Sequence, residues 1–381
     1  MKRLWIIVVL SMVSTFVVGN VAQAQDGFEI QLEPMLMDVY GYDGHVGDIA
    51  RYREEYSEDY AGNITLDYSA TYDPINLNMK NKFTLRLEVT RRRGQWGLGA
   101  SGWWFNTGDS VSGRVASPEM EWTDTGYILY VNSVRMWDHT ITPPVDNELE
   151  PSYMSPVDYW AEDNLKVWTA DLFLSRTLAE KKNSFANFSW GAKLGSLKTK
   201  ENLGQKQRAF IYDYDYGYDF DNHITLESTA EADCTFMVGP VLGFQGKVKR
   251  GKFDIEGFIN QSVLFGKVKH TGLWEDIDDI LWIDPATGET VWHDVLTGEF
   301  SFSKEDGVAL PVTELKLKVV YYITENIAIG GGGFYSIWWD APVAPKWSMP
   351  GDWYWAEGSG WRLQERILKF GGFMAALRIR I

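Results

Sequence analysis

Period-two alternation of apolar and polar residues is the feature that most constrains what this chain can fold into. In the segment 82–90, Phe83, Leu85 and Leu87 fall on one face, with polar residues between them. The same pattern recurs in four further segments: 238–248, 253–260, 314–324 and 373–381. Strands of globular proteins average only about five or six residues. These runs are nearer to the roughly 9–11 residues that a tilted strand needs to cross a bilayer. We therefore predict an all-β, membrane-spanning barrel.

The segments between the alternating runs are of two contrasting kinds. Short polar turns follow some runs, at residues 91–94, 180–183, 249–252 and 324–326. Other runs are separated by long acidic stretches: 139–164 carries six carboxylates and 273–300 carries eight, and neither contains Lys or Arg. Short turns at one rim and long loops at the other are typical of an antiparallel up-and-down outer-membrane barrel. We expect the acidic stretches to be extracellular loops.

The number of strands follows from parity. Both ends of such a barrel lie in the periplasm, so the count is even. Ten strands place every short turn on one side. The expected strands lie near residues 28–39, 82–90, 95–105, 165–178, 185–198, 234–249, 253–268, 312–323, 327–339 and 366–381. Counting 64–70 and 127–136 as spanning gives twelve, but this puts the 91–94 turn on the wrong side. We predict ten strands and keep twelve as the alternative.

The first residues predict export from the cytoplasm. Lys2 and Arg3 precede an apolar run over 4–18, and Ala22-Gln23-Ala24 supplies a small-residue cleavage site. We expect residues 1–24 to be a cleaved signal peptide and 25–381 to form one barrel domain in the bacterial outer membrane. The net charge of −16 argues against a nucleic-acid partner. A single cysteine, Cys234, excludes an intramolecular disulfide.

Charged residues fall on the face of the strands that should point into the lumen. The predicted lumen or constriction residues are Arg86, Glu88, Asp254, Glu256, Lys316, Lys318, Arg378 and Arg380. In one interpretation they pair with one another and plug the barrel. In the other they form a charged constriction in which the basic residues favour anions. Side chains fill barrels of about eight strands, whereas barrels of about sixteen or more contain an aqueous channel. A ten-stranded barrel is intermediate in width, so the strand number is compatible with both interpretations. Passive passage of small hydrophilic solutes is the leading functional hypothesis.

The main alternative is a closed structural or adhesive barrel whose acidic, aromatic loops bind a surface partner or divalent cations. Asp213, Asp215, Asp219 and Asp221 alternate with aromatic residues and form the candidate calcium site. A solvated extension of a hairpin is the competing interpretation of the same segment. No other cofactor is expected. The sequence contains no nucleophile elbow or zinc-protease motif, so we expect no enzyme, with a hydrolase at the rim as the alternative.

Two further segments carry a resemblance to known proteins. The chain resembles outer-membrane barrels of Gram-negative bacteria, most of all the porin-like barrels grouped with major outer membrane proteins. The segments that carry this resemblance are Val238-Gly239-Pro240-Val241-Leu242-Gly243 and, after the next turn, Ser262-Val263-Leu264-Phe265-Gly266. This resemblance implies outer-membrane lipids, lipopolysaccharide and the barrel-assembly machinery as partners. Such barrels commonly end on an aromatic residue, whereas this chain ends on Ile381. A monomer is the favoured oligomeric state.

Overall fold

The computed structural model describes residues 27–41, 45–58, 63–77, 79–80, 82–116, 119–124, 126–136, 139–140, 156–181, 183–213, 218–283, 290–348 and 360–381. The predicted signal peptide lies outside these residues. The strands are β1 (Gly27–Tyr40), β2 (His45–Glu58), β3 (Ile64–Asn76), β4 (Lys82–Arg93), β5 (Trp96–Val115), β6 (Glu119–Thr123), β7 (Gly126–Met136), β8 (His139–Thr140), β9 (Val157–Lys181), β10 (Ser184–Asp213), β11 (Tyr218–Arg250), β12 (Phe253–Ile283), β13 (Thr290–Tyr322), β14 (Ile327–Ser348) and β15 (Gly360–Arg380). Within the described ranges, no helix is long and apolar enough to cross a membrane.

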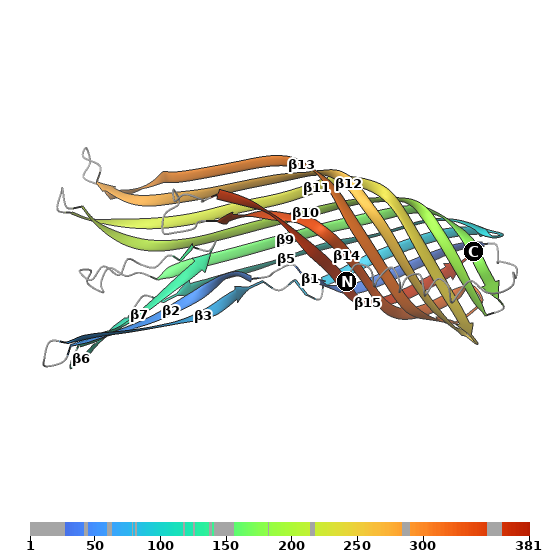
Figure 1. Ribbon diagram of the computed structural model, residues 1–381, viewed down its shortest axis with the longest axis horizontal. Coiled ribbons are helices and arrows are strands. Elements are labelled where there is room, and N and C mark those ends of the chain that lie inside the picture. The colour runs from blue at the N-terminus through green and yellow to red at the C-terminus, as the bar shows by residue number, and fades with distance from the viewer. Residues whose placement is uncertain are drawn as a thin grey trace.

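Ten strands form a closed antiparallel barrel in the order β1-β15-β14-β13-β12-β11-β10-β9-β5-β4. The ring closes at β1, where Ile30 pairs with Ile379 of β15 on one side and with Val89 of β4 on the other. The prediction of ten strands is confirmed. The turns after β4, β9, β11 and β13 all lie at one end, where β1 begins and β15 finishes. We call this end the turn rim (Figure 1).

An apolar belt surrounds the part of the barrel next to the turn rim. On each strand, outward positions over roughly ten residues are apolar, as at Leu98 (59% exposed) and Leu172 (61% exposed). Beyond the belt the outward positions become charged, for example Lys166, Lys198 and Lys269. The belt has the length that a bilayer crossing requires.

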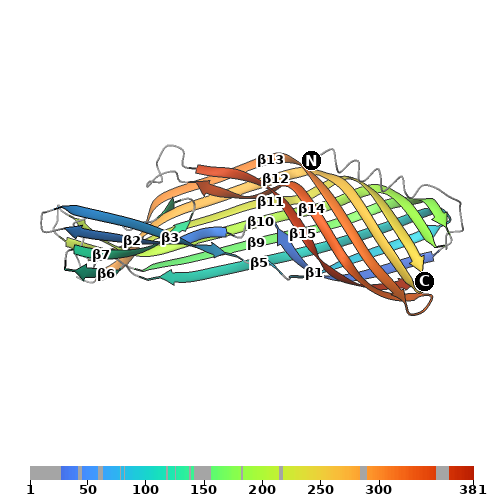
Figure 2. The ribbon, with the colours of Figure 1, turned by 60° about the horizontal axis from the view of Figure 1, so that its bottom comes forward.

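One wall of the barrel projects far beyond the apolar belt. Strands β9 to β13 are 25 to 33 residues long, whereas β1 and β4 have 14 and 12. Figures 1 and 2 show this wall extending away from the turn rim. The expectation of long loops at 139–164 and 273–300 is therefore wrong in part, because 157–164, 273–283 and 290–300 are strand. Outside the apolar belt a strand needs no apolar outer face, so the pattern that identified the spanning strands is missing here.

A second, smaller sheet lies beside the projecting wall. Strands β3, β2, β7 and β6 pair in that order, and β8 pairs with β7. The segments 64–70 and 127–136 belong to this sheet, so the twelve-strand alternative is wrong. Val46, Ile75 and Val134 from this sheet join Val115 of β5 and Val157 of β9 in one buried apolar cluster.

The hairpin of β14 and β15 leaves the barrel wall above the belt. Pairing between β13 and β14 ends at Val312 and Trp338, while β13 continues upward beside β12 alone. Asp340, directly after this point, has a φ of 54°. Every residue from Ala341 to Pro345 is buried, on both faces of the strand. The hairpin thus lies inside the wall, where Trp347 stacks on Trp274 of β12 at 5.4 Å between ring centroids.

Candidate functional site: the barrel interior

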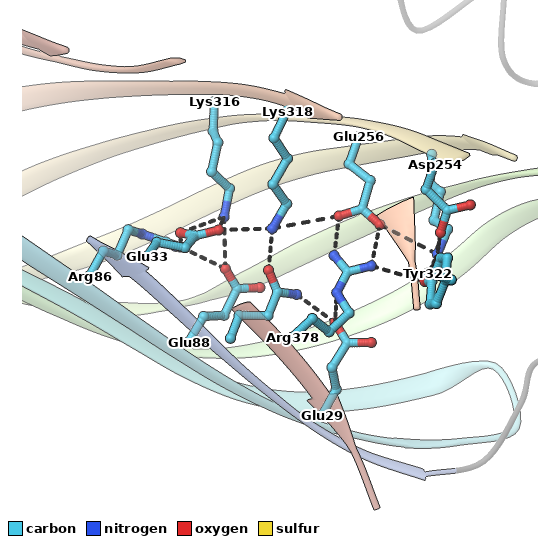
Figure 3. Close-up of polar contacts among 12 residues, drawn as sticks. Glu29, Glu33, Arg86, Glu88, Asp254, Glu256, Lys316, Lys318, Tyr322 and Arg378 are labelled. Atoms are coloured by element: carbon cyan, nitrogen blue, oxygen red, sulfur yellow. Dashed lines mark hydrogen bonds and ion pairs between the residues drawn. The ribbon is translucent and has the colours of Figure 1, made fainter. Parts of the chain in front are cut away.

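A network of buried ion pairs occupies the lumen at the level of the apolar belt. Its centre is Glu33, whose carboxylate is fully buried on β1. Glu33 accepts hydrogen bonds from Arg86 of β4 at 2.7 Å, from Lys316 of β13 at 3.0 Å and from Lys318 at 2.8 Å. Arg86 also pairs with Glu88 at 2.7 Å. The close-up in Figure 3 shows these side chains converging from opposite walls.

A second group of charges lies between this centre and the turn rim. The Arg378 guanidinium donates two hydrogen bonds to the Glu256 carboxylate (Figure 3). It also forms an ion pair with Glu29 at 3.1 Å. Glu29 also pairs with Arg380 at 2.9 Å. A fork of N–H donors on a carboxylate is the strongest ordinary form of ion pair, since two aligned hydrogen bonds add to the charge attraction.

The third group joins β9 and β10 to β13. The Lys193 ammonium, 0% exposed, lies 2.8 Å from Asp171 and 3.0 Å from Glu314. The Trp103 indole donates a hydrogen bond of 3.0 Å to Glu314. This group thus holds one positive and two negative charges, and the neutral Trp103 N–H stabilises one of the two carboxylates.

The charges that take part in these interior ion pairs balance. The acidic members are Glu29, Glu33, Glu88, Asp171, Asp254, Glu256 and Glu314, and the basic members are Arg86, Lys193, Lys247, Lys316, Lys318, Arg378 and Arg380. Seven carboxylates thus face seven basic groups. All eight predicted lumen residues belong to this set, so the structure brings them together. It does not leave the basic ones as a strip of free positive charge, because each has an acidic partner.

An apolar layer fills the lumen above the ion pairs. Every barrel strand except β4 contributes buried apolar side chains to one cluster. At its centre Trp103 contacts Phe334 and Phe370, at 5.8 and 5.6 Å between ring centroids. Trp338 and Phe105 pack against the other sides of Phe370. Large apolar side chains from nine of the ten barrel strands thus meet in one cluster inside the barrel.

Hollow space lies near the ion pairs. A polar cavity of about 40 Å³ lies beside Ser101, Asp171 and Asn187. A wider vestibule of about 590 Å³ opens at the turn rim, where Lys247, Asp254, Glu256 and Arg378 form part of its lining. Buried polar groups of this kind are satisfied either by each other or by water.

Several members of the network were not predicted from the sequence, among them Glu29, Gln31, Glu33 and Glu314. The signal for the first three was present, because they alternate with outward apolar residues along β1. What the sequence does not reveal is that these three side chains meet Arg86, Lys316, Lys318 and Arg378 of other strands. Gly332 of β14 leaves room for the Lys318 side chain, since a Cβ at position 332 would lie 2.8 Å from the Lys318 Cβ.

Two of the titratable groups in the interior of the projecting wall, beyond the apolar belt, have shifted pKa values. Burial raises the pKa of the Glu201 carboxyl on β10, although Lys346 and Arg366 act in the opposite direction. Burial lowers the pKa of His270 on β12 below its ordinary value. The other histidine side chains lie outside the described part of the chain, so the hydrolase at the rim opposite the turn rim stays a hypothesis.

The candidate calcium site falls mostly outside the described residues. Asp215 is not described, and for Asp213, Asp219 and Asp221 only the backbone is, at the tip of the β10–β11 hairpin. Within the described residues, no group of three acidic, histidine or cysteine side chains is arranged to hold a metal ion.

Comparisons with known proteins find similarity in structure only. No protein-family model and no curated protein sequence matches the chain. Similar solved structures include the outer membrane protease OmpT from Escherichia coli, with 12% identity and a TM-score of 0.38 over 95% of this chain and 99% of that one. The toluene transporter TodX of P. putida has 8% identity and a TM-score of 0.24, over 94% and 90% of the two chains. The transport unit of the E. coli autotransporter AIDA-I also has 8% identity and a TM-score of 0.24, over 94% and 92%. The ten-stranded barrel itself is established by this chain's own strand pairing.

Proposed function

We propose that this chain is an integral outer-membrane β-barrel with a closed lumen, which acts by binding a surface partner through the wall that projects beyond the membrane. Its placement in the outer membrane is supported by the outward apolar belt, by the closed ring that leaves no unpaired strand edge in lipid, and by the predicted export signal.

The single observation that carries the closed state is the apolar layer around Trp103 and Phe370. A hydrophilic solute crossing this layer would lose its hydration without gaining hydrogen-bond partners, which costs several kcal/mol for each polar group. The paired charges below the layer add a second obstacle, because opening a path between them separates buried ions. This arrangement favours the closed barrel over the passive solute channel, which was the leading hypothesis from the sequence.

The projecting wall supplies the surface for function. Strands β10 to β13 have about three times the length needed to cross a bilayer, so most of their residues lie on its far side. A barrel that served only as a membrane anchor would not need this extension. The acidic balance of the chain favours a cationic partner or divalent cations bridging to lipopolysaccharide phosphates.

Conductance of the refolded protein in a planar bilayer tests the closed state. We expect the wild-type protein to be silent, with folding shown by heat-modifiable gel migration. The matched variant Trp103→Ala plus Phe370→Ala removes the centre of the layer and should produce discrete conductance steps. Reproducible steps from the folded wild-type protein, reduced by Arg378→Ala plus Arg380→Ala, would instead establish the channel.

A further inference from the structure

An apolar groove crosses the outer face of the barrel within the apolar belt. It has a volume of about 700 Å³ and extends over β10 to β14. Its floor is a row of cross-strand partners, in which Ala186 pairs with Gly246, Gly246 with Gly257, Gly257 with Leu317, and Leu317 with Gly333. Four of these five residues are Ala or Gly, so the floor lies low on both sides of Leu317, whose side chain is 63% exposed. A Cβ added at Gly246 would meet no atom within 4 Å.

Larger side chains form the two sides of the groove. Phe244, Ile259 and Leu315 occupy the next outward row on the side away from the turn rim. Val248 and Ile255 occupy the row on the other side. The groove is therefore a channel one row wide, apolar on its floor and on both sides, and it faces the surface that lipid would cover.

The groove starts near the turn rim and rises into the belt. Ala186 is two residues from the start of β10, Gly246 is four from the end of β11, and Gly333 is six from the start of β14. Neighbouring strands are about 4.8 Å apart, so the five strands span about 19 Å. This length is comparable to one leaflet, which is half of the roughly 30 Å hydrocarbon core.

Positive charge is concentrated beside the low end of the groove. Arg250 lies four residues below Gly246 on the same outward face, and Lys252 follows in the β11–β12 turn. Both side chains are exposed, and neither forms an ion pair with any residue that the structure describes. Lys181, at the neighbouring end of β9, is also exposed. An anion at the membrane surface would meet these groups within one or two rows of the groove entrance.

We propose that this groove binds one anionic phospholipid of the periplasmic leaflet. One acyl chain lies along the row from Ala186 to Gly333 and bends past the Leu317 side chain, and the headgroup phosphate contacts Arg250 and Lys252. The apolar groove would bind the acyl chain, and the basic β11–β12 turn would bind the headgroup phosphate. Because the groove rises from the turn rim into the belt, one lipid molecule can reach both. The inference rests on the proposed membrane location of the barrel.

Native mass spectrometry of the full-length mature protein tests this site. Delipidated protein is titrated with phosphatidylglycerol or with phosphatidylcholine of the same chain length. We expect the wild-type protein to bind one phosphatidylglycerol at least tenfold more tightly than phosphatidylcholine. Gly246→Leu plus Gly257→Leu fills the groove and should weaken binding of both lipids at least tenfold. Arg250→Gln plus Lys252→Gln should remove the preference while retaining the weaker binding.

The control is Ala100→Leu, which adds a leucine at an outward position of β5, two strands away from the β10 end of the groove. It should bind lipid as the wild-type protein does. Equal binding by the wild-type protein and the filled-groove variant would overturn the proposal, as would a two-chain species that the same variant dissociates, because the groove would then be a dimer contact. Insertion into vesicles is measured on each sample. A protein that inserts but lacks the selective site overturns only this inference, whereas one that does not insert overturns the proposed function.

Discussion

At the scale of single residues, the interior shows how a buried charge is tolerated. Lys193 has no access to solvent, and its stability depends on Asp171 and Glu314 within 3.0 Å. Removing one member of a buried pair leaves the others charged and desolvated, which costs more than the pair itself contributes. Exposed pairs lack this penalty because water replaces the lost partner.

Lys193→Met should therefore lower the free energy of unfolding by about 3–5 kcal/mol. The matched control is Lys198→Met on the same strand, which breaks the half-exposed pair with Glu231 at 2.6 Å and should cost less than about 1 kcal/mol. Urea titrations of both variants in lipid vesicles measure the difference. Equal losses would mean that Lys193 is not held as a buried charge.

At the scale of elements, the distinctive feature is the inward bend of the β14–β15 hairpin. The bend is located at Asp340, whose positive φ is unfavourable for residues other than glycine. Beyond it, the hairpin exchanges pairing with β13 for apolar packing, in which Trp347 contacts Trp274 and Trp361. The Trp361 indole also donates to the Phe300 carbonyl of β13 at 3.1 Å. The hairpin thereby fills space that a taller, open barrel would leave empty.

Asp340→Gly should raise the stability of the folded barrel by up to about 1 kcal/mol, because glycine adopts this backbone conformation without a steric cost. Asp340→Ala should lower stability, since alanine lacks the local hydrogen bonding that helps aspartate in this region. Chemical denaturation should thus rank the three proteins Gly, Asp, Ala. An alanine variant as stable as the glycine variant would show that the bend is not strained.

At the scale of the whole molecule, an apolar belt and a polar extension divide the same long strands. On β9 the outward face changes from Leu172 to Lys166 within six residues. This change marks where we expect the membrane to end.

Cysteine labelling in intact vesicles locates this boundary. A water-soluble maleimide should label Lys166→Cys rapidly and Leu172→Cys at least tenfold more slowly, because the lipid tails cover only the second position. The native Cys234 is 0% exposed, so the wild-type protein supplies a low background. Both variants should react fully after unfolding in urea. Fast labelling of Leu172→Cys in vesicles would contradict the proposed placement of the belt.

The sequence by itself determined the ten barrel strands, their inward and outward faces and the four short turns. These properties are local, because a strand next to lipid must alternate residue by residue and a tight turn needs only a few polar residues. The eight predicted lumen residues were found for the same reason. Apart from the hairpin extension expected around Asp213 and Asp221, the extension of β9 to β13 was missed, because strands outside the lipid do not need an apolar outer face.

Only the tertiary structure shows which inward side chains meet across the lumen. Lys316 and Glu33 are separated by 283 positions, and their pairing depends on which strands face each other across the closed ring. The inward hairpin and the apolar layer likewise depend on side chains from nearly every strand meeting at one level. The alternation of apolar and polar residues shows which way a side chain points. The state of the barrel interior depends on which other side chains the inward ones contact, and this follows only from the tertiary structure.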